Sequence, residues 1–153
     1  MVDNALFSSK SLEWETPQWL FDTLDNEFKF DVDVCASPVN HKLIPYLDIH
    51  RNSLTIPWSE HYRTCWMNPP YGRGIGKWMC KAYEESLKGC TVVCLVPSRT
   101  GTRWFHDWVL GKADIRFLKG RLKFGSSKNS APFDSILAIY RGTQHTPKGD
   151  HRA

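Results

Sequence analysis

The chain has 153 residues, of which 41% are hydrophobic, 13% are aromatic and 24% are charged. These proportions are typical of a globular protein with one core, and they exclude a disordered chain or a fibre. No apolar run approaches the roughly 20 residues of a membrane-spanning helix, and residues 1–10 lack the pattern of a signal peptide. We therefore expect a cytoplasmic protein without a membrane partner, with one domain at 1–141 and a loose polar tail at 142–153.

The net charge of +4 is unevenly distributed along the chain. Residues 1–33 hold eight acidic side chains and two basic ones, whereas residues 97–128 hold eight basic and two acidic ones. A basic segment attracts polyanions, although solvated surfaces also carry such runs. The distribution favours a nucleic-acid partner.

The five cysteines stand at spacings that match neither a disulfide framework nor a zinc site. Cys90 and Cys94 lie four residues apart in a strand-like run, where both side chains would point to one face of a sheet. We expect reduced, mostly buried thiols at Cys35, Cys65, Cys80, Cys90 and Cys94, and no metal.

The first half of the chain contains one clear helix. Apolar residues recur at helical spacing over 17–28, with Thr16 in the N-cap position and Pro17 in the first turn. Residues 41–62 predict an irregular connection, because prolines interrupt every candidate helix in it. The strands predicted in this half are a short one at 30–35, a buried one at 64–67, and two segments able to pair, 46–47 and 53–54.

The second half continues the alternation of helices and strands, ending in two neighbouring strand patterns. Such alternation predicts a doubly wound α/β sheet with helices on both faces and a terminal antiparallel hairpin. The predicted elements are a helix at 75–87 that stops at Gly89, a strand at 91–96, a helix at 102–110, a strand at 115–117, and the pair 120–124 with 135–140.

Asn68-Pro69-Pro70-Tyr71 is the sharpest motif, because it directly follows the predicted strand at 64–67. Ligands of open α/β sheets gather at the carboxyl ends of strands. The Asn68 side-chain oxygen and the Pro69 carbonyl can accept hydrogen bonds from an exocyclic amine, and Tyr71 can lie flat against a planar ring. The alternative, a stiff turn capped by a packed tyrosine, is less favoured by four such residues in this order.

An exocyclic amine is a poor nucleophile because its lone pair is delocalised into the ring. Acceptors that hold its N–H groups favour localisation of that pair, and a fixed geometry makes the attack effectively unimolecular. No general base is required if the electrophile already carries a positive charge. These requirements point to a sulfonium methyl donor, S-adenosylmethionine.

Seven segments of the chain together resemble phage DNA N-6-adenine methyltransferases, the Dam-like phage group. The resemblance spans about residues 11–140. Asn-Pro-Pro-Tyr alone also occurs in amino-methyltransferases that act on glutamine or RNA, and the other segments make the resemblance more specific. The segments are Ser11–Pro17, Asp33–Ser37, Asn68–Gly72, Leu95–Thr100, Trp104–His106, Gly120–Phe124 and Ala131–Phe133.

The resemblance implies a single-domain Rossmann-like fold of the class I methyltransferase type, in abbreviated form, with a mainly parallel sheet and a C-terminal antiparallel hairpin. It also implies methyl transfer from S-adenosylmethionine to the N6 amine of adenine in DNA, in the host bacterial cytoplasm. The residues it implies are Asn68, Pro69, Pro70 and Tyr71 for catalysis; Trp14, Thr16 and Pro17 at the methionine end of the cofactor; and Asp33, Cys35, Ala36 and Ser37 in the first-strand cofactor motif.

The cofactor motif departs from the broader methyltransferase pattern, because residues 33–38 contain no glycine. Only 34 residues separate Asp33 from Asn68, too few for two full β-α units, so an abbreviated segment must contact the cofactor adenine and ribose. A surface loop is an equally good interpretation of each candidate. The candidates are Asn52 and Leu54 for the adenine, and Asp48 or Asn40 for the ribose.

The basic half supplies candidate DNA contacts in or beside predicted strand-end loops. A target adenine inside a duplex must leave the stack to reach Asn68, so we expect a pocket walled by Tyr71 and by Phe124 or Phe133, although both phenylalanines also suit a core. Loops or a second subunit, for example in a homodimer, would have to recognise the DNA sequence. The candidate DNA contacts are Arg73, Arg99, Arg103, Arg121 and Lys123.

Two other functions stay open at this point. The chain could be an S-adenosylmethionine-dependent amino-methyltransferase that acts on RNA or on protein glutamine. It could instead be a catalytically inactive nucleic-acid-binding module, which would bind DNA without binding the methyl donor.

Overall fold

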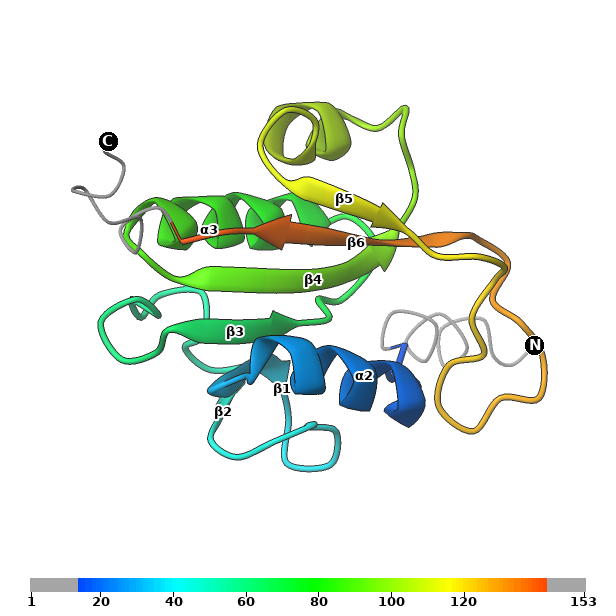
Figure 1. Ribbon diagram of the computed structural model, residues 1–153, viewed down its shortest axis with the longest axis horizontal. Helices are drawn as coiled ribbons and strands as arrows, with labels where there is room; N and C mark the ends of the chain where they lie inside the picture. Colours follow the sequence, from blue (N-terminus) through cyan, green and yellow to red (C-terminus); the bar gives the residue numbers. More distant parts are fainter. Residues whose placement is uncertain (1–13, 143–153) are drawn as a thin grey trace.

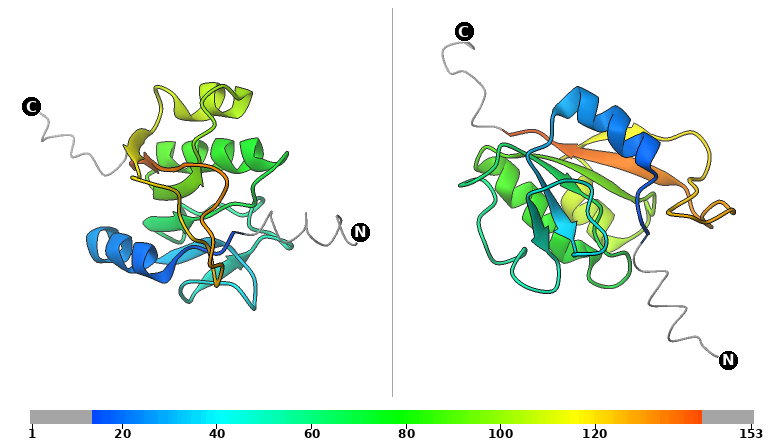
Figure 2. Two further views of the ribbon diagram at one scale, coloured as in Figure 1. Left: turned by 90° about the vertical axis from the view of Figure 1, so that its right-hand side faces the viewer. Right: turned by 90° about the horizontal axis from the view of Figure 1, so that it is seen from below.

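A computed structural model of the chain describes residues 14–142, which form one six-stranded sheet with helices on both faces (Figures 1 and 2). The strand order is β2-β1-β3-β4-β6-β5. The elements are α2 (Gln18–Phe28), β1 (Val32–Ala36), β2 (Tyr46–Asp48), β3 (Thr64–Met67), α3 (Ile75–Leu87), β4 (Thr91–Pro97), the π-helix η1 (Phe105–Val109), β5 (Asp114–Phe117) and β6 (Ser135–Tyr140).

The sheet contains a point at which the chain reverses its direction across the strands. Strands β2, β1, β3 and β4 are parallel, and β1 lies between β2 and β3, so the chain crosses to the other side of β1 after β2. In open α/β sheets, ligands bind in the crevice at such a switch point, beside the carboxyl ends of the strands. The antiparallel β6 begins at the same edge, because Ser135 pairs with Pro97 at the end of β4.

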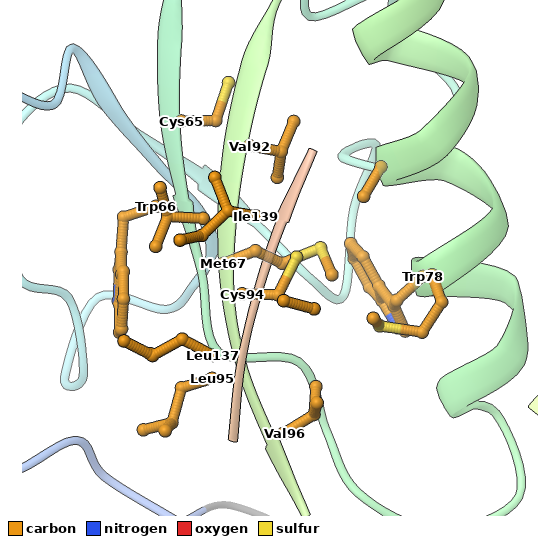
Figure 3. Close-up of a cluster of buried hydrophobic side chains, with 14 of the residues drawn as sticks. Cys65, Trp66, Met67, Trp78, Val92, Cys94, Leu95, Val96, Leu137 and Ile139 are labelled. Carbon is orange, nitrogen blue, oxygen red and sulfur yellow. The ribbon is translucent and has the colours of Figure 1, made fainter. Parts of the chain in front are cut away.

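The core lies in two layers, one on each face of the sheet. Trp66 on β3 faces α2, where its ring centroid lies 5.6 Å from those of Phe21 and Phe30. Figure 3 shows the opposite layer, in which alternate residues of β3 and β4 point toward Trp78 on α3. Those residues are Cys65, Met67, Val92, Cys94 and Val96. Since both faces of β4 are covered, its continuous apolar run is that of a central strand.

Most predicted elements form, and β3 and α3 have the predicted bounds. The helix expected at 102–110 forms over 103–109, and its part Phe105–Val109 is the π-helix η1. Thr16 is not the N-cap of α2, because Pro17 takes that position and the Thr16 hydroxyl accepts a hydrogen bond from Asn68 instead. The prediction of a strand at 53–54 is wrong: the residues form a turn in which the Ser53 hydroxyl donates to the Val34 carbonyl.

The predicted antiparallel pair exists at the end of the sheet, but one partner differs. The strand at 120–124 does not form, and β5 lies beside β6 in its place, with Phe117 opposite Ile136. Gly120 and Gly125 both have left-handed backbone conformations, with φ of 75° and 57°, which interrupt an extended strand. Residues 118–134 therefore form a long connection between β5 and β6.

All five cysteines are free thiols, and three of them are buried, as predicted. The Cys65 and Cys90 sulfur atoms lie 3.1 Å apart, in hydrogen-bond contact. Among residues 14–142, no group of three His, Cys, Asp or Glu side chains is placed to hold a metal ion. No helix in the same range has the length and apolar character needed to cross a bilayer. The predicted tail, apart from Gly142, and the motif residues before Trp14 lie outside the described part of the chain.

We predict that Trp66→Ala destabilises the fold by about 4 kcal/mol, because it leaves a cavity between β3 and α2. Trp66 is 1% exposed, whereas Trp19 on the outer side of α2 is 61% exposed. The matched control Trp19→Ala should change the free energy of unfolding by less than about 0.5 kcal/mol. Urea unfolding followed by circular dichroism measures both, and equal losses would contradict this assignment of the core.

Candidate active site

The side-chain amide of Asn68, directly after β3, is held from both ends. Its nitrogen donates to the Thr16 hydroxyl at 2.9 Å and to the backbone carbonyl of Trp14. Its oxygen accepts a hydrogen bond from the Tyr71 hydroxyl at 3.0 Å. A carbonyl oxygen has two lone pairs, so the Asn68 oxygen keeps one acceptor position for an outside N–H group.

Tyr71 is 6% exposed, and its hydroxyl is part of the protein's own hydrogen-bond network. The hydroxyl lies 3.1 Å from the Leu95 carbonyl as well as 3.0 Å from Asn68. Burial raises the pKa of Tyr71 well above its ordinary value, so the hydroxyl stays a donor. The ring meets Phe133 edge-on at 5.7 Å and Phe124 edge-on at 6.4 Å. Tyr71 therefore fixes the orientation of the Asn68 amide.

The two prolines and Gly72 turn the chain from β3 toward α3. Neither proline has an N–H group to pair in a sheet, so the strand ends at Met67. Gly72 has a φ of 117°, a left-handed value that favours glycine, and α3 begins at Ile75. The turn places the Asn68 side chain at the switch point of the sheet.

A small hollow lies at the switch point, between the carboxyl ends of β1 and β3. Its volume of about 30 Å³ has room for about two water molecules. Segments far apart in sequence meet around it, and the predicted residues among them are Trp14, Thr16, Asp33, Cys35, Ala36, Ser37, Asn40, Asn68, Pro69 and Pro70. Lys42, Ile49 and Trp66 complete the wall and were not predicted from the sequence.

Asp33 is 3% exposed, and both of its carboxylate oxygens accept backbone hydrogen bonds. One accepts from the Cys35 N–H at 3.1 Å and the other from the Lys42 N–H at 2.9 Å. Burial raises the pKa of Asp33 from its ordinary value of 3.8 to about 6, against the opposing effect of these two N–H groups. Asp33 thereby joins the end of β1 to the loop that follows it.

This loop explains why the motif after β1 contains no glycine. Ser37 and Asn40 exchange backbone hydrogen bonds of 3.0 and 3.2 Å, and the His41 ring lies 3.0 Å from the Ser37 carbonyl. No residue between Asp33 and Lys42 has a positive φ. The turn is built from hydrogen bonds within ordinary backbone conformations, which any residue type can adopt.

A large cavity of about 520 Å³ borders the same loop at Tyr71 and Gly72, and it shares Trp14 with the small hollow. Its volume lies in the range of sites that bind organic ligands. Of the predicted residues, Tyr71, Arg73, Arg99 and Phe133 line it. Phe124 is buried behind it, with its ring 5.4 Å from that of Trp14.

Trp104 also lines the large cavity, and no site role was predicted for it from the sequence. A Cβ atom at Gly76 would lie 3.4 Å from the Trp104 Cβ, so Trp104 packs directly against the start of α3. Its only sequence signal was its place in the segment Trp104–His106, which belongs to the family resemblance. Periodicity alone could not separate a cavity wall from a core position.

Other predicted residues lie outside both hollows. Arg103, Arg121 and Lys123 are exposed on the surface. Asn52 is also exposed, and Leu54 lines a separate depression beside α3. Two further predicted residues have local structural contacts. Pro17 is buried at the N-cap of α2, and the Asp48 carboxylate accepts a hydrogen bond from the His50 N–H.

Comparison with known proteins gives two matches over nearly the same part of the chain. Residues 4–142 match the family described as DNA N-6-adenine-methyltransferase (Dam). A protein of Haemophilus phage HP1 (strain HP1c1), named DNA N-6-adenine-methyltransferase, is 33% identical over 135 residues, which cover 86% of this chain and 76% of the relative. The span matched to the family contains every residue that lines the small hollow and the large cavity.

We predict that the stability advantage of the wild type over Asp33→Asn falls by about 3 kcal/mol between pH 3 and pH 8. The pKa of the folded state, about 6, lies above the ordinary value of 3.8, so the contribution is complete at low pH and is lost as the pH rises through 6. Urea unfolding across this range measures the difference. Replacing the carboxylate by an amide also loses a hydrogen-bond acceptor. That cost is the same at every pH, so it does not affect how the stability difference changes with pH.

Asp22→Asn, at an exposed position on α2, is the matched control for removing one carboxylate. It should give a much flatter difference than Asp33→Asn. A pH-independent difference for Asp33→Asn would contradict the buried environment of that carboxyl group.

Proposed function

This chain belongs to the DNA N-6-adenine-methyltransferase (Dam) family, and we propose that its two substrates bind in two separate spaces, the small hollow and the large cavity. It is a DNA adenine methyltransferase with S-adenosylmethionine as its methyl donor. The small hollow receives the donor, and the large cavity receives the target adenine. One observation carries the proposal: Trp14 lines both spaces, and the loop Asn68–Tyr71 runs from one to the other, with Asn68 to Pro70 on the small hollow and Tyr71 on the large cavity. A nucleophile in one space and an electrophile in the other would meet at Asn68.

We also propose that the sheet is an abbreviated Rossmann-like methyltransferase fold. Its support is the parallel part of the strand order, the switch point between β1 and β3, and the candidate site at the carboxyl ends of those strands. Family membership favours DNA over the RNA, glutamine and inactive-module alternatives. Location in the host cytoplasm and a homodimer stay predictions.

In this proposal Asn68 and Pro69 orient the adenine amine. The free acceptor position on the Asn68 oxygen and the Pro69 carbonyl take its two N–H groups, which favours a localised lone pair on nitrogen. Thr16 and Tyr71 hold the amide so that this oxygen cannot rotate away. Because the acceptors are oriented before the substrate arrives, little reorganisation is needed during the reaction.

The lining of the small hollow fits the chemistry of the donor. S-adenosylmethionine, when bound, supplies a methyl group on a positively charged sulfur. The carboxylate of Asp33 favours a cationic ligand, Asn40 offers an amide, and Ile49 and Trp66 offer apolar contacts. Since the hollow measures about 30 Å³, it encloses only part of a donor of this size.

The large cavity fits a planar base attached to a phosphate backbone. Tyr71, Trp104 and Phe133 supply aromatic walls, and the exposed Arg73 and Arg99 supply positive charge. An adenine that is extruded from the duplex loses its stacking on neighbouring bases, at a cost of a few kcal/mol, and aromatic walls restore part of it. The two arginines are placed to neutralise the flanking phosphates.

We predict that Asn68→Ala lowers kcat for DNA methylation by at least about a hundredfold, because it removes an acceptor that the reacting amine requires. The fold and much of the donor binding should remain, since the change removes an acceptor for the amine and little core volume. Transfer of a labelled methyl group to DNA and calorimetry with the donor measure these quantities. Unchanged turnover would reject this role of Asn68.

Tyr71→Phe separates the function of the hydroxyl from that of the ring. The ring and its contacts with Phe124 and Phe133 remain, while the hydrogen bond to Asn68 is lost. We predict a fall in kcat of about tenfold with little change in KM for DNA, as expected when an amide loses one orienting partner. A rise in KM alone would instead assign the hydroxyl to DNA binding.

We predict that Arg99→Ala weakens DNA binding and makes the plot of log affinity against log salt concentration less steep by about one, as for the loss of one phosphate contact. Lys88→Ala is the matched control, because it removes an exposed charge after α3, at the amino edge of β4. Titrations of fluorescent duplex DNA at several salt concentrations measure both slopes. Equal slopes for Arg99→Ala and wild type would remove Arg99 from the interface.

A further inference from the structure

We propose that residues 120–130, which we call the rim loop, read the bases that flank the target adenine. This inference rests on the proposed function of the large cavity. It assigns sequence recognition to a segment within this domain. Four features of the loop carry it: its length, its attachment to the site, its exposed polar tip and its outward basic side chains.

The connection that contains the rim loop is much longer than the sheet requires. β5 and β6 are antiparallel neighbours, and a hairpin of two to five residues commonly joins such strands. Here residues 118–134 join them. Connections of this length without regular secondary structure are uncommon in compact domains and usually have a function. In Figure 1 this connection extends past the carboxyl edge of the sheet.

The stem of the rim loop is attached to the candidate active site. The Ala131 N–H donates to the Leu122 carbonyl at 2.7 Å, which closes the loop at its base. The Gly125 N–H donates to the Glu15 carbonyl at 2.8 Å. Glu15 lies between Trp14 and Thr16, the two residues that bind the Asn68 side chain. The loop therefore leaves the site in a defined direction.

Gly125 makes this close attachment sterically feasible. Its φ of 57° is left-handed, and a Cβ atom there would lie 3.4 Å from the Glu15 carboxylate. Phe124, directly before it, is buried against the Trp14 ring at a centroid distance of 5.4 Å. A displacement of the loop would therefore change the position of the Trp14 ring, which lines both the small hollow and the large cavity.

The tip of the loop, residues 125–130, is exposed and contains only glycine, serine, lysine and asparagine. It contributes no apolar side chain to the core. The Ser127 hydroxyl forms a small turn with the backbone of Asn129, at 3.0 and 3.2 Å. Lys128 and Asn129 are exposed, and within residues 14–142 their side chains make no hydrogen bond or ion pair.

These side-chain types match the donors and acceptors on base edges. Asparagine pairs with adenine through two hydrogen bonds, lysine donates to the acceptors of guanine, and serine pairs with several bases. In the stem, Arg121 and Lys123 are exposed and alternate with the buried Leu122 and Phe124. The alternation directs both positive charges outward, where they can hold phosphates while the tip contacts bases.

The test is the double variant Lys128→Ala with Asn129→Ala, compared with wild type and with Lys88→Ala as the matched loss of one charge at the opposite edge of the sheet. Each protein is incubated with unmethylated genomic DNA and S-adenosylmethionine, and methylated adenines are mapped by sequencing. Methylation by the wild type tests the proposed function itself, and the difference between variants tests the rim loop.

We expect the double variant to lose at least about tenfold in its preference for the wild-type sequence over other adenines, as for the loss of one or two base contacts. Its donor binding by calorimetry should be unchanged, and Lys88→Ala should keep the wild-type preference. The proposal is overturned if the double variant methylates the same sequences with the same preference. It is equally overturned if the double variant methylates all sequences more slowly by the same factor. That result would mean that the loop contacts phosphates and does not distinguish bases.

Discussion

The fixed amide of Asn68 is the interaction on which the rest of the site depends. Its nitrogen is bound by the backbone of Trp14 and the hydroxyl of Thr16, and its oxygen by Tyr71, which also contacts the Leu95 carbonyl. These contacts join the segment before α2, the loop after β3 and strand β4. An amide held at both its nitrogen and its oxygen cannot rotate, so its remaining acceptor position has one direction. That direction supports the proposal that the half-buried Asn68 positions the amine of the target base.

The same constraint explains how a short chain holds two binding spaces. Trp14 belongs to the segment that binds Asn68, and it lines both the small hollow and the large cavity. Asp33 organises the opposite wall of the small hollow by accepting the N–H groups of Cys35 and Lys42. Only β2 lies on that side of β1, and a buried carboxylate with its hydrogen-bonded loop forms the wall there.

Strongly periodic or strongly punctuated segments were predictable from the sequence. The bounds of β3 and α3 were correct because prolines and a glycine end the strand and start the turn, and β4 was recognised from its continuous apolar run. The prediction of a strand at 120–124 was wrong because β5 occupies the place beside β6. The alternating pattern that suggested this strand does exist, since Leu122 and Phe124 are buried. Alternation indicates which side chains are buried and cannot indicate which neighbour a segment finds.

By itself, the sequence determined the family, because residue identities and their order carry it, and it predicted the catalytic role of Asn68–Tyr71. It also determined the alternation of helices and strands, through local propensity and apolar spacing. Only the tertiary structure decided that Thr16 binds Asn68 instead of capping α2, that Trp104 faces a cavity, and that Asn52 and Leu54 lie away from the small hollow. The reason is physical: a hydrogen bond or a cavity wall needs groups from distant segments, and their meeting depends on the path of the whole chain.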